Sequence, residues 1–242
     1  QITQQASPLL TKFQNDVKLN QVLFDRVKKV FENRESEILT SEQLTLLKKE
    51  FKSFARNGAL LSEDEKLILR DIDTEKAKLS LSFGENVLAD TNDFLIHITE
   101  ESQLKGLPDQ VKEMGAEIAK SKNKTGWIFT LDYPSYVPFM TYLDNRELRR
   151  KMSLAFGQRG FRENDHNNSK IILKIIELRK KRAELLGYES HANFILAERM
   201  ASSEKNVNNF LEDLYQKALP AAKKEWEELV SYAKKYLNID QI

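Results

Sequence analysis

Apolar residues recur along much of the chain at spacings of three and four, the period of an α-helix with one buried face. In the segment 40–57 this row is Leu44, Leu47, Phe51 and Phe54. The row is preceded by a capping box at 40–43 and followed by a glycine at position 58, the usual signals for the start and end of a helix. The pattern therefore predicts a helix over 40–57.

Two neighbouring segments carry the same signature. A second capping box at 62–65 introduces a long row made of Ile68, Ile72, Leu79, Phe83 and Val87. A shorter row follows Asn20 and consists of Leu23, Val27, Val30 and Phe31. Because these segments are joined by short connections, they predict an up-and-down helical bundle.

The middle of the chain has a different pattern. Segments 93–99 and 126–131 are short, rich in β-branched and aromatic residues, and bounded by turn formers, so each predicts a strand. Between them, a helix is expected to open at Pro108 and to turn Val111, Met114 and Ile118 inward. We therefore expect a two-stranded β ribbon over about 93–131, inserted between helical parts, with the strand direction left open.

Helical signals return in the last hundred residues. A helix is expected around Pro138, which a helix tolerates in its first turn. Further helices are expected from the Asn145 cap to Gly157, over 171–186, over 190–200, and from Ser203 onward with a kink at Pro220. The polar segment 159–169 is expected to be a loop. The fold class predicted for residues 1–242 is thus mainly α, one helical unit with a small β ribbon.

Composition narrows the choice of function. The chain of 242 residues has a formal net charge of +1, with 38 basic and 37 acidic residues interleaved along it. No field of one sign is available to attract nucleic acid or anionic lipid, so we expect neither nucleic acid nor membrane as a partner. There are no cysteines, which excludes disulfides, thiolate zinc sites and cysteine nucleophiles and leaves a cytoplasmic or a periplasmic location open.

The three histidines are the first candidates for a metal site. His97, His166 and His191 are scattered, and none begins the H-E-x-x-H pattern that places two imidazoles on one helical face around zinc. His166, beside Glu163 and Asp165, is the best ligand candidate, although a solvated loop histidine is the favoured interpretation. We therefore assign no catalytic and no metal-binding residue to this chain.

Two further clusters have a structural and a functional interpretation. The basic run 179–182 could contact phosphates, but its place on the polar side of an amphipathic helix favours a solvated face. The aromatic residues Tyr133, Tyr136, Phe139 and Tyr142 could line a substrate cleft, but sealing the junction of ribbon and bundle is favoured. The substrate-binding residues remain unknown.

Several motifs, taken in order, resemble the M3 family of zinc metallopeptidases. They are YPSYVPFM at 133–140, DNRELR at 144–149, LRKKRAELLGY at 178–188, SHANF at 190–194 and RMA at 199–201, together with FARNGALLS at 54–62 and GLP at 106–108. The likeness runs from about Ser7 to the end, and it is greater to the bacterial peptidyl-dipeptidase (dipeptidyl carboxypeptidase) branch than to oligopeptidase A.

This resemblance implies the N-terminal part of the neurolysin-like M3 fold. In the full-length enzyme, zinc held by H-E-x-x-H and a later glutamate would activate water, and C-terminal dipeptides would be removed from short unfolded peptides. The chain up to Ile242 contains no such motif, so we expect an N-terminal fragment that forms a channel wall, holds no cofactor and is inactive alone. Its expected partners are peptides, the C-terminal catalytic lobe and, through an exposed apolar face, a second copy of itself. The alternative is a non-catalytic helical module that binds a peptide or protein.

Overall fold

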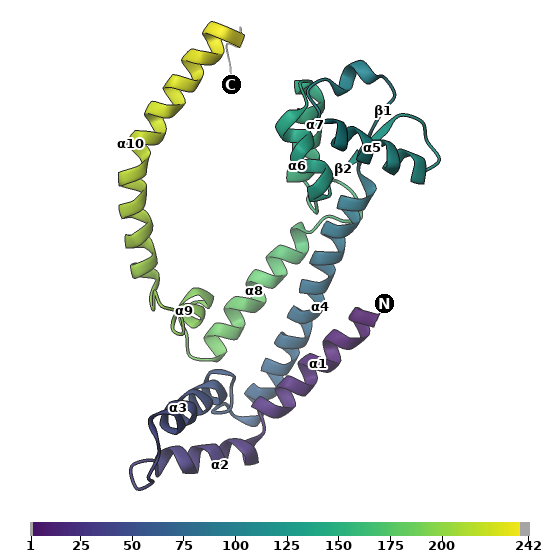
Figure 1. The fold of residues 1–242 in the computed structure, drawn as a ribbon. Helices are drawn as coiled ribbons and strands as arrows, with labels where there is room; N and C mark the ends of the chain where they lie inside the picture. Colours follow the sequence, from purple (N-terminus) through teal and green to yellow (C-terminus); the bar gives the residue numbers. More distant parts are fainter. Residues whose placement is uncertain (1, 238–242) are drawn as a thin grey trace. The chain divides into compact units, whose positions relative to one another are not determined.

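The computed structural model describes residues 2–237, and its contacts divide the chain into two compact units, Gln1–Arg179 and Lys180–Ile242. The elements appear in Figure 1. In chain order they are α1 (Ile2–Lys18), α2 (Gln21–Glu32), α3 (Ser41–Arg56), α4 (Glu63–Asp93), β1 (Leu95–Ile98), η1 (Glu101–Leu104), α5 (Asp109–Ser121), β2 (Trp127–Thr130), α6 (Tyr133–Tyr142), α7 (Arg146–Gly157), α8 (Ser169–Leu185), α9 (His191–Leu196) and α10 (Glu204–Leu237). The predicted mainly α class with a small ribbon is confirmed.

The capping signals act as predicted. Thr40 Oγ1 accepts the Gln43 N–H at 3.2 Å, and the Gln43 side chain accepts the Thr40 N–H at 2.9 Å. Gly58, with φ of +96°, follows α3 in the left-handed conformation that ends many helices. The box at the start of α4 lowers the pKa of Glu65, because the backbone and then the side chain of Ser62 hydrogen-bond its carboxylate.

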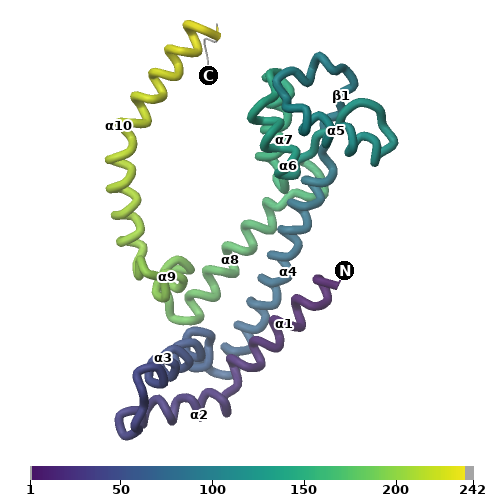
Figure 2. Tube along the Cα trace, in the orientation of Figure 1, coloured from purple at the N-terminus to yellow at the C-terminus, as the bar shows by residue number. Residues whose placement is uncertain are grey.

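Helix α1, with Pro8 inside it, is not among the helices that the sequence analysis predicts. It runs alongside α4 in the opposite direction (Figure 2) and packs against it. An ion pair between Arg70 and Asp16, with Nη1 and Oδ1 2.6 Å apart, joins the two helices. Packing against α4 therefore contributes to the stability of α1.

Helices α2 and α3 form a second pair, held by aromatic rings. Phe24 is buried between the rings of Phe51 and Phe54, with centroid separations of 5.8 and 6.0 Å. Phe31 stacks on Phe51 at 4.0 Å. Phe31, Phe51 and Phe54 lie on the rows that the helical period predicts. On α2, however, the buried residue is Phe24, whereas Leu23, which was predicted to face inward, is 38% exposed.

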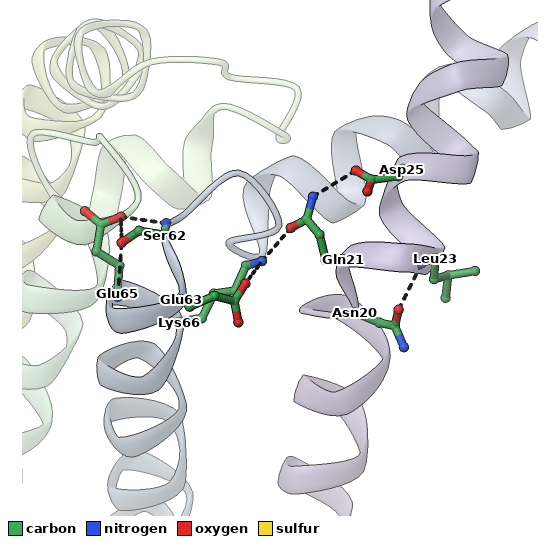
Figure 3. A network of polar contacts seen from close by, with 8 residues as sticks. All are labelled: Asn20, Gln21, Leu23, Asp25, Ser62, Glu63, Glu65 and Lys66. Carbon is green, nitrogen blue, oxygen red and sulfur yellow. Dashed lines mark hydrogen bonds and ion pairs between the residues drawn. The ribbon is translucent and has the colours of Figure 1, made fainter.

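A buried lysine connects α2 to the start of α4 (Figure 3). Only 3% of Lys66 is exposed, and its Nζ donates to the Gln21 side chain at 2.6 Å and to Glu63 Oε1 at 2.9 Å. Gln21 in turn donates to Asp25 Oδ1 at 2.8 Å. A buried ammonium is costly unless its protons are bonded, so this network fixes the approach of the two helix ends.

The two strands pair antiparallel, which settles the direction that the sequence left open. Leu95 lies opposite Thr130 and Ile98 opposite Trp127. Helix α5 covers β2 closely, because a Cβ added at Gly115 would lie 2.9 Å from Cζ of Phe129. The main core forms here, between the ribbon and α5 to α7; its buried members are Ile96, Ile98, Leu104, Leu107, Val111, Phe129, Leu131, Phe139, Leu143, Met152 and Ala155.

The expected facing of Ile68 was also wrong. Ile68 was placed on the inward row of α4, but it is 52% exposed, whereas its neighbour Leu69 is fully buried. On α5, Met114 packs against the main core from a half-buried position, and Gly115 and Ala119 are the more deeply buried residues. The smaller residues face inward because only they allow the close approach to Phe129.

Pro138 also departs from its expected position in a first helical turn. Helix α6 already begins at Tyr133, with Pro134 in its first turn, and Pro138 lies inside it. The Asp132 carbonyl starts the helix by accepting the N–H groups of Ser135 and Tyr136 at 2.9 and 2.7 Å. The carbonyl that Pro138 leaves without a donor is that of Pro134, still within the first turn.

In the second unit, α9 is capped by Ser190, whose hydroxyl accepts the Asn193 N–H at 3.0 Å and donates to Glu204 Oε1 at 2.7 Å. The Ser190–Glu204 bond joins α9 to the first residue of α10. Helix α10 continues through Pro220 without ending there. Among the helices of residues 2–237, none combines the length and apolar character that crossing a bilayer demands.

The core placement yields a first prediction. Replacing Phe139 by alanine, Phe139→Ala, should lower the free energy of unfolding by about 3–5 kcal/mol, because the fully buried ring leaves a cavity beside Phe129. The matched change Tyr133→Ala, at a side chain 70% exposed, should cost less than about 1 kcal/mol. Urea unfolding followed by circular dichroism measures both, and equal losses would contradict the packing described here.

Candidate functional site

A polar cluster joins the long helix α4 to the loop between α7 and α8. Asp90 is fully buried near the C-terminal end of α4. Its Oδ2 accepts the Gly160 N–H at 2.6 Å, and its Oδ1 accepts from the Asn164 side chain at 2.7 Å. Both carboxylate oxygens are therefore bonded to the loop.

The electrostatics of this carboxylate favour its charged form. Burial by itself would raise the pKa of Asp90. The hydrogen bonds from Asn164 and Gly160, with the positive charges of Arg162 and His166, outweigh burial and lower the pKa below its usual value. Asp90 thus stays ionised and holds the loop by charge-assisted hydrogen bonds.

The end of the loop is held by a second buried polar side chain, Asn168, which is 1% exposed. Its amide donates to the Phe83 carbonyl at 3.1 Å and accepts from Asn86 at 2.9 Å. Its own N–H bonds the Gly160 carbonyl at 2.7 Å. Segment 158–168 is irregular, as predicted, but it is tied to one face of α4 at both ends.

Sequence reasoning missed this cluster, although two signals point to it. Asp90 continues the row of Phe83 and Val87 at spacings of four and three, so a carboxylate stands where the next inward residue is due. Asn164, Asn167 and Asn168 crowd into one loop. A buried acid and a group of amide side chains are mutually suitable partners.

The tied loop forms one wall of a groove of about 640 Å³. The other wall is a face of α7, and Phe94 at the end of α4 lies between them. The lining residues are Phe94, Glu147, Leu148, Arg150, Lys151, Leu154, Ala155, Gln158 and Arg162. The volume is in the range of sites that bind small ligands or short peptide segments.

Arg162 belongs to both features. Its guanidinium lies 5.6 Å from the centre of the Phe94 ring and donates to the Ala155 carbonyl at 2.9 Å. Its positive charge also acts on Asp90. The groove and the polar cluster are therefore parts of one arrangement, in which the loop positions a cation beside an aromatic ring.

The aromatic residues that could have lined a cleft are divided between core and surface. Phe139 is fully buried, and Tyr136 stacks on Phe156 at 4.1 Å. Tyr133 and Tyr142 are 70% and 51% exposed. The first two have the structural role that the sequence favoured, and the four do not form one wall.

The histidines do not assemble a zinc site in the part of the chain that the structure describes. His166 Nε2 lies 3.5 Å from Asp93 Oδ2, and one imidazole with one carboxylate falls short of the three or four protein ligands that zinc takes. His97 Nε2 is bonded to the Thr125 carbonyl at 2.7 Å, and the His191 ring lies against Phe194. Over residues 2–237 no three histidine, aspartate or glutamate side chains gather as metal ligands would.

The basic run 179–182 was expected to form a solvated face, but one of its four residues is buried. Arg182 is buried, 8% exposed, with its guanidinium 5.1 Å from the centre of the Phe194 ring. The other three residues of the run are exposed. A guanidinium stacks favourably on an aromatic ring, and this contact explains why Arg182 faces inward.

Comparison with known proteins agrees with this helical framework. Residues 139–242 match the family model described as "Peptidase family M3". The Escherichia coli protein "Oligopeptidase A" is 30% identical over 243 residues, which are 99% of this chain and 36% of the relative. Escherichia coli "Dipeptidyl carboxypeptidase" is 29% identical over 92% of this chain and 32% of the relative. Yeast "Saccharolysin" is 29% identical over 93% and 31%.

These matches align the chain with one part of longer proteins. The chain belongs to peptidase family M3, and it spans about a third of the length of the curated relatives it matches. The identities to the oligopeptidase and the dipeptidyl carboxypeptidase, 30% and 29%, do not separate the two branches.

The polar cluster yields a second prediction. The variant Asp90→Asn should lose about 2–3 kcal/mol of stability at pH 7, because Gly160 and Asn164 donate to different carboxylate oxygens and the variant replaces one of these acceptors by an NH2 donor. The control Asp93→Asn, at an exposed side chain, should change stability far less. Limited proteolysis within 158–168 should accelerate in Asp90→Asn alone.

The same carboxylate sets a pH dependence. Because its pKa is lowered by folding, its contribution is complete above the unfolded-state value of about 3.9 and is lost as the pH falls through the folded value. The stability difference between wild type and Asp90→Asn should therefore be constant from about pH 7 to 5 and shrink below about pH 4. A difference that grows on acidification would contradict the lowered pKa.

Proposed function

We propose that this chain is the channel-wall portion of a zinc-dependent peptidyl-dipeptidase, which removes C-terminal dipeptides from short unfolded peptides. The observation that carries the proposal is the similarity of almost the whole chain to M3 family peptidases, at about 30% identity. The relatives are about three times longer than the aligned region. The proposal therefore places the catalytic centre in sequence beyond these residues.

Zinc does not fit the described residues, since His97, His166 and His191 each have other neighbours and no ligand set. In this proposal the metal belongs to the H-E-x-x-H region of the catalytic lobe, which would be a partner of this chain. The role of the helical wall would be to limit access by size, so that unfolded peptides enter and folded proteins do not.

Exposed apolar surface supports a face that another part of the protein covers. Between α4 and α8 lies a groove of about 420 Å³ lined by Phe83, Ile172, Ile175 and Ile176, with Ser80 and Arg179 at its edge. Leu173 and Ile176 are 70% and 56% exposed. Apolar surface of this kind marks interfaces, here with the catalytic lobe or, in the isolated chain, with a second copy.

The second candidate is a helical module that binds a peptide or protein without chemistry. A groove of about 440 Å³ between α2 and α3, lined mainly by Val27, Val30, Leu39, Leu46 and Leu47, is of the kind that receives an apolar helix face. The gene separates the two candidates. Continuation into an H-E-x-x-H helix supports the peptidase, and a stop codon after position 242 supports the module.

Metal analysis tests the assignment of chemistry. The isolated chain should contain no stoichiometric zinc and should not hydrolyse an oligopeptide with a free C-terminus. The longer gene product should contain about one zinc per chain, release dipeptides and lose this activity to a chelator. Stoichiometric zinc in the isolated chain, or dipeptide release that a chelator does not affect in the longer protein, would overturn the proposal.

A further inference from the structure

The groove on α7 contains charged side chains that form no ion pair with the described part of the chain. Glu147, Arg150, Lys151, Leu154 and Gln158 are spaced by three, one, three and four residues, so they share one face of the helix. Arg150 and Lys151 lie at adjacent positions near the middle of this face, and both are exposed.

Neighbouring arginines are committed to backbone carbonyls. Arg149 donates to the carbonyls of Leu143 and Asp144, and Arg159 donates to that of Phe156 at 2.9 Å. Arg162, which also lines the groove, donates to Ala155 and lies over Phe94. Among residues 2–237, Arg150 and Lys151 make no ion pair, so their charges remain available to a ligand.

The groove is also apolar along part of its length. Leu148, Leu154 and Ala155 lie on α7, and Phe94 closes the side toward α4. Three cations face one carboxylate, Glu147, so the net charge of the lining is positive. A ligand that matches this lining carries negative charge next to apolar groups.

We propose that this groove binds an extended peptide segment that carries acidic side chains next to apolar ones. Its carboxylates pair with Arg150 and Lys151, and its apolar side chains lie on Leu154 and Phe94. The inference deepens the proposed function by naming a substrate class, peptides rich in glutamate or aspartate. The inference rests on the proposed function for the statement that the peptide is a substrate, but not for the binding itself.

Fluorescence anisotropy on the chain itself provides the test. The probe is a labelled eight-residue peptide with two Glu residues flanked by Leu and Phe, and the comparison peptide has Gln at both Glu positions. At low salt the acidic peptide should bind about tenfold more tightly, with one peptide per chain, and salt should weaken this preference. Equal affinities, no binding, or a different stoichiometry would overturn the inference.

Charge reversal locates the binding. The double variant R150E/K151E should raise the Kd for the acidic peptide about tenfold or more. Its matched control is K48E/K49E, which makes the same change of charge at two adjacent exposed lysines on α3. An equal loss of affinity in both variants would show that the peptide responds to overall charge, and it would overturn binding in the groove.

Two further variants exclude a folding defect as the explanation. E147Q removes the one acidic side chain from the lining and should tighten binding about twofold to threefold. R150K/K151R keeps both charges and should bind like the wild type. Tighter binding by E147Q and unchanged binding by R150K/K151R cannot arise from an unfolded chain. Loss of peptide binding in both variants would contradict the proposed contacts.

The outcome is separable from that of the proposed function. Selective binding in the groove by a gene product without dipeptide release would remove the peptidase assignment and keep the peptide site. Dipeptide release by the longer protein without selectivity for acidic peptides in this chain would remove the peptide site and keep the peptidase.

Discussion

The buried carboxylate of Asp90 requires two donors, and both come from one irregular loop. A charge removed from water destabilises the fold unless it is fully bonded, so Gly160 and Asn164 must stay where they are once α4 has formed. The position of the loop in turn fixes the end of α7 and, through Asn168, the start of α8. Arg162, which belongs to the same loop, lines the groove on α7. The attachment to Asp90 therefore also positions one side of that groove.

Most helix ends could be predicted from short-range signals in the sequence. The boxes at Thr40 and Ser62, the cap at Asn145 and the left-handed glycines at 58 and 187 are short-range signals, and the helix ends follow them. The facing of individual residues was less predictable, as the exposed Leu23 and Ile68 show. Which side of a helix is buried depends on the partner that packs there, and α1, the partner of α4, is not among the helices that the sequence predicts.

The candidate site was mostly beyond prediction for the same reason. Asp90 and Asn164 are separated by 74 positions, and their contact follows from tertiary structure alone. The histidines have distinctive chemistry, yet each contacts a different partner: Thr125 for His97, Asp93 for His166 and Phe194 for His191. Family membership and structure therefore inform different questions, since the first relates this chain to its relatives and the second shows which surfaces its residues expose.

Two adjacent arginines on α7 illustrate how differently one residue type can be constrained. Nη1 of Arg149 donates to the carbonyls of both Leu143 and Asp144, so loss of this side chain would leave two carbonyls without that donor. Arg150 has only a charge to offer, which lysine supplies equally well. Among homologous sequences, position 149 should consequently be almost fixed, while position 150 should drift between the two basic residues.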